Sequence, residues 1–157
     1  HIVCFEGSWS DGVYKTWKDF LTDSAKMRAF ISQNPADDWI LHCEDYWYFL
    51  CTFTALLQCG KRILLTQNIS EAFIDEVKKP GVEFLTDQNA TGSASIQDII
   101  EKSDLPDEQY IRSVPQVDSG KTRILMFTSG STGKPKAVPQ RMTEFELDNA
   151  FIISKWA

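Results

Sequence analysis

One short segment, residues 128–136, combines side chains that are suited to binding an anion. Its members are four hydroxyl residues, two glycines and two lysines: Thr128, Ser129, Gly130, Ser131, Thr132, Gly133, Lys134 and Lys136. Glycine lets the backbone adopt positive φ and approach a ligand closely, so that successive N–H groups can point into one concavity. The hydroxyls add donors, and the lysines add positive charge to a chain whose net charge is -6. We expect this segment to bind a polyphosphate.

Other motifs do not match the spacing of this segment. The Walker loop requires G-x-x-x-x-G-K followed by Ser or Thr, whereas two residues separate Gly130 from Gly133 and Pro135 follows Lys134. The dinucleotide-binding pattern G-x-G-x-x-G and the nucleophile elbow G-x-S-x-G do not occur in the sequence. A flexible surface turn is the alternative, because Gly, Ser, Thr and Pro are common in turns. The apolar strand that precedes the segment, together with the two lysines, favours an anion site.

Alternating strands and helices are predicted to position this segment. Apolar runs predict strands at residues 39–43, 62–66, 82–86 and 123–127. Helical spacing and capping residues predict helices that start after Thr16, Asp45, Ser70 and Ser95, and a last helix from about Met142 to Trp156. Residues 88–94 and 103–119 are predicted to be loops. Because parallel strands need crossovers, and those crossovers are the helices, we expect an α/β fold: a mostly parallel sheet flanked by helices on both faces.

Composition excludes several classes of protein. The 157 residues are enough for one domain with a substantial core, or for one piece of a larger protein. The net charge of -6 and the pI near 4.9 argue against a nucleic-acid partner. The most apolar run, Tyr46 to Cys59, is shorter than the roughly 20 residues of a membrane span. Four cysteines without a C-x-x-C pair predict no metal site, reduced thiols and a cytoplasmic location.

Three further groups of residues are assigned structural roles. His42 at a strand end is expected to be structural rather than catalytic. Glu44 and Asp45 precede a predicted helix, where the helix dipole alone explains adjacent carboxylates. The aromatic side chains that follow are expected to pack in the core rather than to line an acyl pocket: Tyr46, Trp47, Tyr48, Phe49 and Phe53.

Residues 127–138, F-T-S-G-S-T-G-K-P-K-A-V, resemble the phosphate-loop signature of the adenylate-forming enzymes. This superfamily contains acyl- and aryl-CoA synthetases, nonribosomal peptide adenylation domains and luciferases. A weaker likeness covers residues 39–66. The resemblance implies that the residues of segment 128–136 named above surround the β and γ phosphates of ATP. Lys134 stands at a variable position of the signature, whereas Lys136 matches its basic residue.

The resemblance also implies a reaction in two steps. A carboxylic acid attacks the α phosphate of ATP to give an acyl adenylate and pyrophosphate, and the thiol of CoA or of a carrier protein then takes the acyl group and releases AMP. The family places its magnesium ligand, its adenine contacts and a mobile carboxy-terminal domain after this loop. Residues 1–157 are therefore expected to be the amino-terminal part of an AMP-binding ligase domain, without a complete active site or catalytic residue of their own.

Departures from the family pattern leave other functions open. Ala137 replaces a glycine that many members have, and residues 139–142 replace a Thr-His pair. These changes indicate a divergent branch, and the carboxylic acid stays unassigned. One alternative is a truncated, non-catalytic homologue that acts as a binding or scaffold module. Another is an unrelated anion-binding α/β protein with a chance match.

Overall fold

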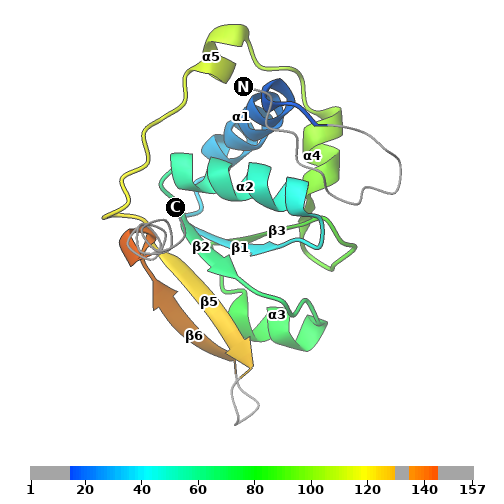
Figure 1. Cartoon of the computed structure of the whole chain (residues 1–157). Helices are drawn as coiled ribbons and strands as arrows, with labels where there is room; N and C mark the ends of the chain where they lie inside the picture. The colour runs from blue at the N-terminus through cyan, green and yellow to red at the C-terminus, as the bar shows by residue number, and fades with distance from the viewer. Residues whose placement is uncertain (1–14, 130–134, 145–157) are drawn as a thin grey trace.

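One mixed sheet forms the centre of the protein. The structure, a computed structural model, describes residues 15–129 and 135–144. Within them the sheet has the order β4-β3-β1-β2-β5-β6 (Figure 1). Its strands are β1 (Asp38–His42), β2 (Arg62–Leu65), β3 (Val82–Thr86), β4 (Ala94–Ser95), β5 (Ile124–Ser129) and β6 (Pro135–Gln140). Neighbouring strands from β4 to β5 run parallel, whereas β6 pairs antiparallel with β5 at the edge.

Helices cover both faces of this sheet. They are α1 (Trp17–Gln33), α2 (Tyr46–Gln58), α3 (Glu71–Val77), α4 (Ile96–Lys102) and α5 (Glu108–Arg112). Figure 1 shows α1, α2 and α4 on one face and α3 on the other. The expected α/β fold, with a mostly parallel sheet between helices, is therefore confirmed.

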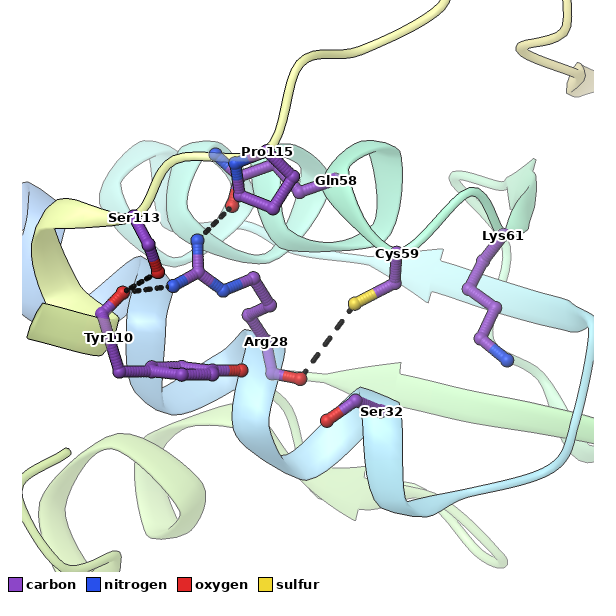
Figure 2. Close-up of a pocket in the computed structure, with 8 residues that line it drawn as sticks. All are labelled: Arg28, Ser32, Gln58, Cys59, Lys61, Tyr110, Ser113 and Pro115. Carbon is purple, nitrogen blue, oxygen red and sulfur yellow. Dashed lines mark hydrogen bonds between the residues drawn. The ribbon is translucent and has the colours of Figure 1, made fainter.

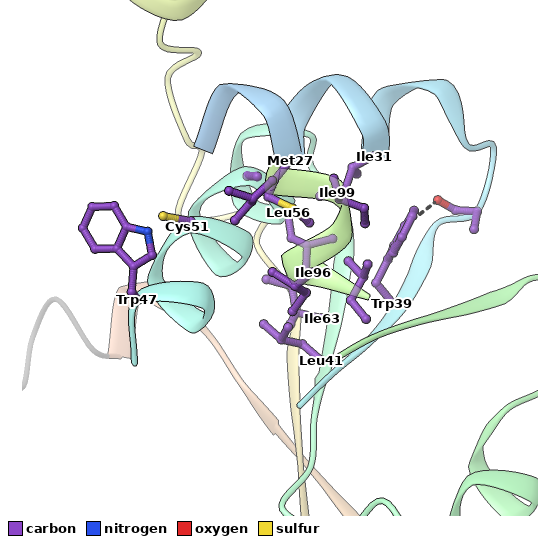
Figure 3. Close-up of a cluster of buried hydrophobic side chains, with 14 residues drawn as sticks. Met27, Ile31, Trp39, Leu41, Trp47, Cys51, Leu56, Ile63, Ile96 and Ile99 are labelled. Carbon is purple, nitrogen blue, oxygen red and sulfur yellow. Dashed lines mark hydrogen bonds between the residues drawn. The ribbon is translucent and has the colours of Figure 1, made fainter. Parts of the chain in front are cut away.

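Alternate residues of each central strand supply two apolar cores. Trp39 and Leu41 of β1 face the larger core, which α1, α2 and α4 complete with Met27, Leu56 and Ile96 (Figure 3). Ile40 lies between them on the chain and belongs to the second core, together with Leu64, Phe84 and two residues of α3, Phe73 and Ile74. A strand that is buried on both faces reads as a continuous apolar run. For this reason the central strands were visible in the sequence.

Side-chain caps fix the starts of the two long helices. Thr16 and Asp19 form the predicted capping pair of α1: the Asp19 backbone N–H donates to Thr16 Oγ1 at 3.2 Å, and the Thr16 N–H donates to Asp19 Oδ2 at 2.7 Å. Asp45 caps α2 by accepting from the N–H groups of Trp47 and Tyr48. Ser70 differs from the prediction, because it precedes α3 but its side chain makes no capping hydrogen bond.

Three elements depart from the predicted order. β6 was not predicted, because Pro135 and Pro139 argue against a strand; an edge strand tolerates them because one of its sides needs no N–H donor. α5 lies inside the predicted loop 103–119, where Asp107 caps it by accepting from the Tyr110 N–H at 2.8 Å. β4 consists of Ala94, the last residue of the predicted loop 88–94, and Ser95, which follows it. Of the predicted last helix, residues 142–144 are helical and the others lie outside the described residues.

The aromatic and cysteine side chains follow the expectations in part. Trp47 is buried, but Tyr46, predicted to be in the core, is 62% exposed because it starts α2 on its outer side. Cys43, Cys51 and Cys59 are free thiols. Among the helices of the described residues, none combines the length and the apolar character that crossing a bilayer requires.

Candidate functional site

The candidate anion-binding segment starts at the carboxyl edge of the parallel strands. Thr128 and Ser129 were expected in a loop but form the last two residues of β5. Lys136 belongs to β6, and its backbone lies opposite that of Thr128. Five further members of the segment lie outside the described residues: Gly130, Ser131, Thr132, Gly133 and Lys134. The structure thus brings the two ends of the predicted segment together in one hairpin.

This hairpin extends beyond the neighbouring strand. The pairing of β5 with β2 ends at Met126, opposite Leu65, whereas its pairing with β6 continues to Ser129. Three residues separate these two positions, which corresponds to about 10 Å along a strand at ~3.3 Å per residue. The backbone at Thr128 and Lys136 therefore lies past the last β2–β5 pair, where the sheet no longer covers that side of β5.

An aromatic contact anchors the strand immediately before the segment. The ring of Phe127 packs edge-on against the ring of Phe73 on α3, with centroids 5.5 Å apart and planes at 90°. Leu125, two residues earlier on the same strand face, packs against the same apolar cluster. Edge-to-face pairs of this kind prefer one relative orientation. The end of β5 is thus held by α3, on the face of the sheet opposite α2.

Buried polar side chains gather at the same edge, beside the ends of β1 and β3. His42 Nδ1 lies 3.2 Å from Thr86 Oγ1, and this pair joins the last residues of the two strands. Asp87 follows directly, and its Oδ2 accepts from the backbone N–H groups of Glu44 at 3.0 Å and of Asp45 at 2.7 Å. These contacts support the structural role expected of His42. They also show that the chain after β3 holds the start of α2.

The structural contribution of Asp87 was not predicted from the sequence. In the sequence, only its place as an acidic residue directly after the apolar run 82–86 distinguishes Asp87. The two backbone N–H groups that it binds are more than forty positions earlier, as the separations of 42 and 43 residues show. No local pattern connects positions so far apart.

The connections of the strands make this edge a place where ligands bind in other α/β proteins. α2 follows β1 on one face of the sheet, whereas α3 follows β2 on the opposite face (Figure 1). In open α/β sheets, ligands bind outside the carboxyl ends of strands where the chain leaves toward opposite faces. The segment that begins in β5 lies beside β2 and so next to this point. Its position is therefore suited to a ligand.

Cys43 is the nucleophile candidate nearest this edge, and its surroundings disfavour that role. It follows β1 directly and is half-buried. Burial raises the pKa of the Cys43 thiol well above its usual range, and the charges of Asp87 and Asp45 raise it further. A thiol that stays protonated is a poor nucleophile. Within the described residues, no group of three or more His, Cys, Asp or Glu side chains is arranged to hold a metal ion.

The same physics predicts slow thiol chemistry in the folded protein. Burial raises the pKa of the Cys51 thiol to about 12, and the pKa of Cys43 is raised as well. At pH 8 we expect iodoacetamide to alkylate both residues at least about tenfold more slowly in the native chain than in the urea-unfolded chain. Mass spectrometry of timed, quenched samples measures the two rates, and equal rates would show that these thiols are accessible and ionised.

No protein-family profile and no curated protein matches this sequence. Several solved structures share its fold. An o-succinylbenzoate CoA synthetase (MenE) variant from Bacillus subtilis is 16% identical, with a TM-score of 0.69, and the match covers 94% of this chain and 32% of that chain. The NpsA N-terminal subdomain from Klebsiella oxytoca, in complex with 3-hydroxyanthranilyl-AMSN, is 22% identical, with a TM-score of 0.62. The match covers 84% of this chain and 35% of that chain.

A third solved structure, McyG A-PCP complexed with phenylalanyl-adenylate, is 18% identical with a TM-score of 0.60 over 83% of this chain and 24% of that chain. The chain thus spans about a third or less of the proteins that it resembles. At these identities the likeness concerns the fold. The protein shares the fold of about a third of the NpsA N-terminal subdomain and of parts of the MenE and McyG structures.

Proposed function

We propose that segment 128–136 binds the β and γ phosphates of ATP and that the chain takes part in ATP-dependent activation of a carboxylic acid. One observation carries this proposal: the segment joins β5 to β6 past the end of the β2–β5 ladder, in the fold of adenylate-forming enzymes. Two glycines, four hydroxyls and two lysines at such a position match the needs of a polyphosphate. The structure of McyG A-PCP complexed with phenylalanyl-adenylate supports an adenine nucleotide as the ligand.

The segment would act by electrostatics rather than by covalent chemistry. In the activation step, a carboxylate oxygen forms a bond to the α phosphorus of ATP, and the bond from that phosphorus to the bridging oxygen breaks. Pyrophosphate leaves with the electron pair. We assign to the hydroxyls, the backbone N–H groups and the exposed Lys136 the task of holding and neutralising the departing phosphates. In a chain of net charge -6, such a local cation also reduces repulsion between the protein and ATP.

The remaining parts of the reaction are assigned to chain beyond the described residues. A magnesium ion would be held by ligands outside this segment and would supply further positive charge for the phosphates. We also propose that CoA or a carrier-protein thiol accepts the acyl group, because one neighbour is a CoA synthetase bound with its product analogue OSB-NCoA and another is an A-PCP protein. The share of about a third that the chain covers supports a role within a longer AMP-forming ligase, and the free thiols support a cytoplasmic location.

Pyrophosphate exchange tests this function. The longest natural polypeptide that contains residues 1–157 is expected to transfer label from pyrophosphate into ATP only when its carboxylic acid is present, because the activation step is reversible. A panel of aryl, fatty and amino acids identifies the acid. Lys136→Ala is expected to reduce the exchange at least about tenfold, whereas Lys102→Ala, on the exposed side of α4, leaves it unchanged. Absence of exchange across the panel would contradict the proposal.

A second candidate is a non-catalytic homologue that uses this fold to bind a partner. It is motivated by the share of each neighbour that the chain covers, about a third or less, because residues 1–157 do not supply the remaining parts of the reaction. A module of this kind would bind no ATP through the segment. Direct titration with ATP therefore separates the two functions.

A further inference from the structure

A pocket of about 390 Å³ lies between α1, the end of α2 and the chain at and after α5 (Figure 2). Its lining residues come from α1, from the end of α2, and from α5 with the residues that follow it; the ones that matter here are Arg28, Ser32, Gln58, Lys61, Tyr110 and Ser113. α2 starts at the carboxyl edge of β1 and returns to the start of β2, so its last residues lie at the amino edge of the sheet. The pocket and the segment are therefore at opposite edges.

Arg28 is the buried cation of this pocket. The residue is only 5% exposed, and its guanidinium lies over the ring of Tyr110, 4.3 Å from the centroid. One terminal nitrogen, Nη1, donates to Gln58 Oε1 at 3.3 Å, and the other, Nη2, donates to the carbonyl oxygen of Tyr110 (Figure 2). These hydrogen bonds use two of the five N–H groups of a guanidinium. All three contacts are made with neutral groups.

This cation has no anionic partner among the described residues. The ion pairs found there join other side chains, and none includes Arg28. A buried charge without a counter-ion is costly, because neutral dipoles and a ring face replace only part of its hydration. The protein has 22 Asp and Glu residues, any of which could have provided a carboxylate as the counter-ion of Arg28. The structure instead leaves the guanidinium beside an open pocket.

The rest of the lining carries no negative charge. Lys61 also lines the pocket, and its Nζ points away from Arg28 and donates to the carbonyl oxygens of Ala36 at 2.6 Å and Asn34 at 3.4 Å (Figure 2). The hydroxyls of Ser32 and Ser113 donate to the carbonyl oxygens of Ala29 at 3.0 Å and Tyr110 at 2.9 Å, and no Asp or Glu contributes to the lining. A planar guanidinium binds carboxylate and phosphate groups through two parallel hydrogen bonds. We propose that this pocket binds the oxyanion group of a small molecule, a carboxylate or a phosphate, with Arg28 as its principal ligand.

Titration of the 157-residue chain with two simple oxyanions tests this site. Inorganic phosphate and malonate are added separately at constant ionic strength, and backbone amide shifts are followed by NMR. We expect saturable shifts at residues around the pocket with at least one anion. The anion with the lower Kd shows whether the pocket prefers a phosphate or a carboxylate group. Arg28→Gln is expected to weaken binding at least about tenfold. Shifts that do not saturate, or that persist unchanged in Arg28→Gln, would overturn the proposal.

Two controls separate this site from general charge and from the proposed ATP segment. Lys102→Gln removes an exposed cation of α4 and should leave the anion affinity unchanged. Lys136→Ala should leave the affinity measured from the shifts around the pocket unchanged, because Lys136 lies at the opposite edge of the sheet. If either control weakens binding as much as Arg28→Gln does, the anion is not held by this pocket. Failure of ATP binding at segment 128–136 would not affect this result.

Gln58→Glu keeps the proposal testable if Arg28→Gln does not fold. The substitution places a carboxylate where Gln58 Oε1 now accepts from Arg28 Nη1. An internal carboxylate should satisfy the guanidinium, raise the Tm and reduce the affinity for the added anion at least about tenfold. Unchanged anion affinity in the folded Gln58→Glu protein would show that Arg28 does not bind the anion.

Discussion

Replacing Asp87 by alanine is expected to lower the free energy of unfolding by about 3 kcal/mol. Asp87 is 9% exposed, and its carboxylate accepts from the backbone N–H groups of Glu44 and Asp45. Hydrogen bonds to a charged acceptor contribute about 1.5–3 kcal/mol each, and a half-buried N–H that loses its partner adds a cost of its own. Because both donors precede α2, the substitution should also loosen the connection between β1 and that helix.

Urea denaturation of matched variants measures this effect. Asp75→Ala, at an exposed position of α3, removes the same carboxylate without buried partners and should change stability by less than about 0.5 kcal/mol. Asp87→Asn keeps one acceptor oxygen and should lie between the two alanine variants. Equal unfolding midpoints for Asp87→Ala and Asp75→Ala would show that the contacts of Asp87 do not stabilise the edge.

Local signals allowed much of the fold to be predicted from the sequence. β1, β2 and β3 are apolar runs because they are buried on both faces, and the starts of α1 and α2 carry residues that cap helices in isolation as well as in proteins. The unpredicted strand β6 lacks such signals. β6 contains Pro135 and Pro139, and it becomes a strand only because β5 offers an edge for pairing.

The residue types of the candidate site could be predicted from the sequence, but its strand pairing and long-range contacts could not. The segment 128–136 is recognisable from its residue types, and its place after a strand follows from the apolar run 123–127. The length of the hairpin was not predictable, because the pairing of Lys136 with Thr128 depends on β6. The roles of Asp87 and Arg28 were not predictable either. Both depend on contacts between positions that are distant in the chain: Asp87 with Glu44, and Arg28 with Tyr110.

The second large effect is expected at Lys136, on nucleotide binding rather than on stability. Its side chain is exposed on the edge strand, so alanine at this position should change the unfolding free energy by less than about 0.5 kcal/mol. A lysine ammonium that contacts phosphate oxygens makes charge-assisted hydrogen bonds, each contributing about 1.5–3 kcal/mol. Since ~1.4 kcal/mol corresponds to a factor of ten, the Kd for ATP should rise at least about tenfold.

Matched controls restrict that effect to the phosphates of the nucleotide. Lys121→Ala removes an exposed lysine that pairs with Asp118 before β5, and it should leave the Kd for ATP unchanged. Adenosine lacks the phosphates that the segment is proposed to bind, and it should bind no more weakly to Lys136→Ala than to the unchanged chain. A loss of ATP affinity in both lysine variants would indicate general electrostatic attraction instead.

The central claim, that segment 128–136 holds the phosphates of ATP, is tested most directly by calorimetric titration of the 157-residue chain with ATP. Wild-type protein and the Lys136→Ala variant are compared at one ionic strength, after circular dichroism has shown that both are folded. The account predicts saturable binding to the wild-type chain and a Kd at least about tenfold higher for the variant. The same Kd for both proteins, or no binding by the folded wild-type chain, would contradict it.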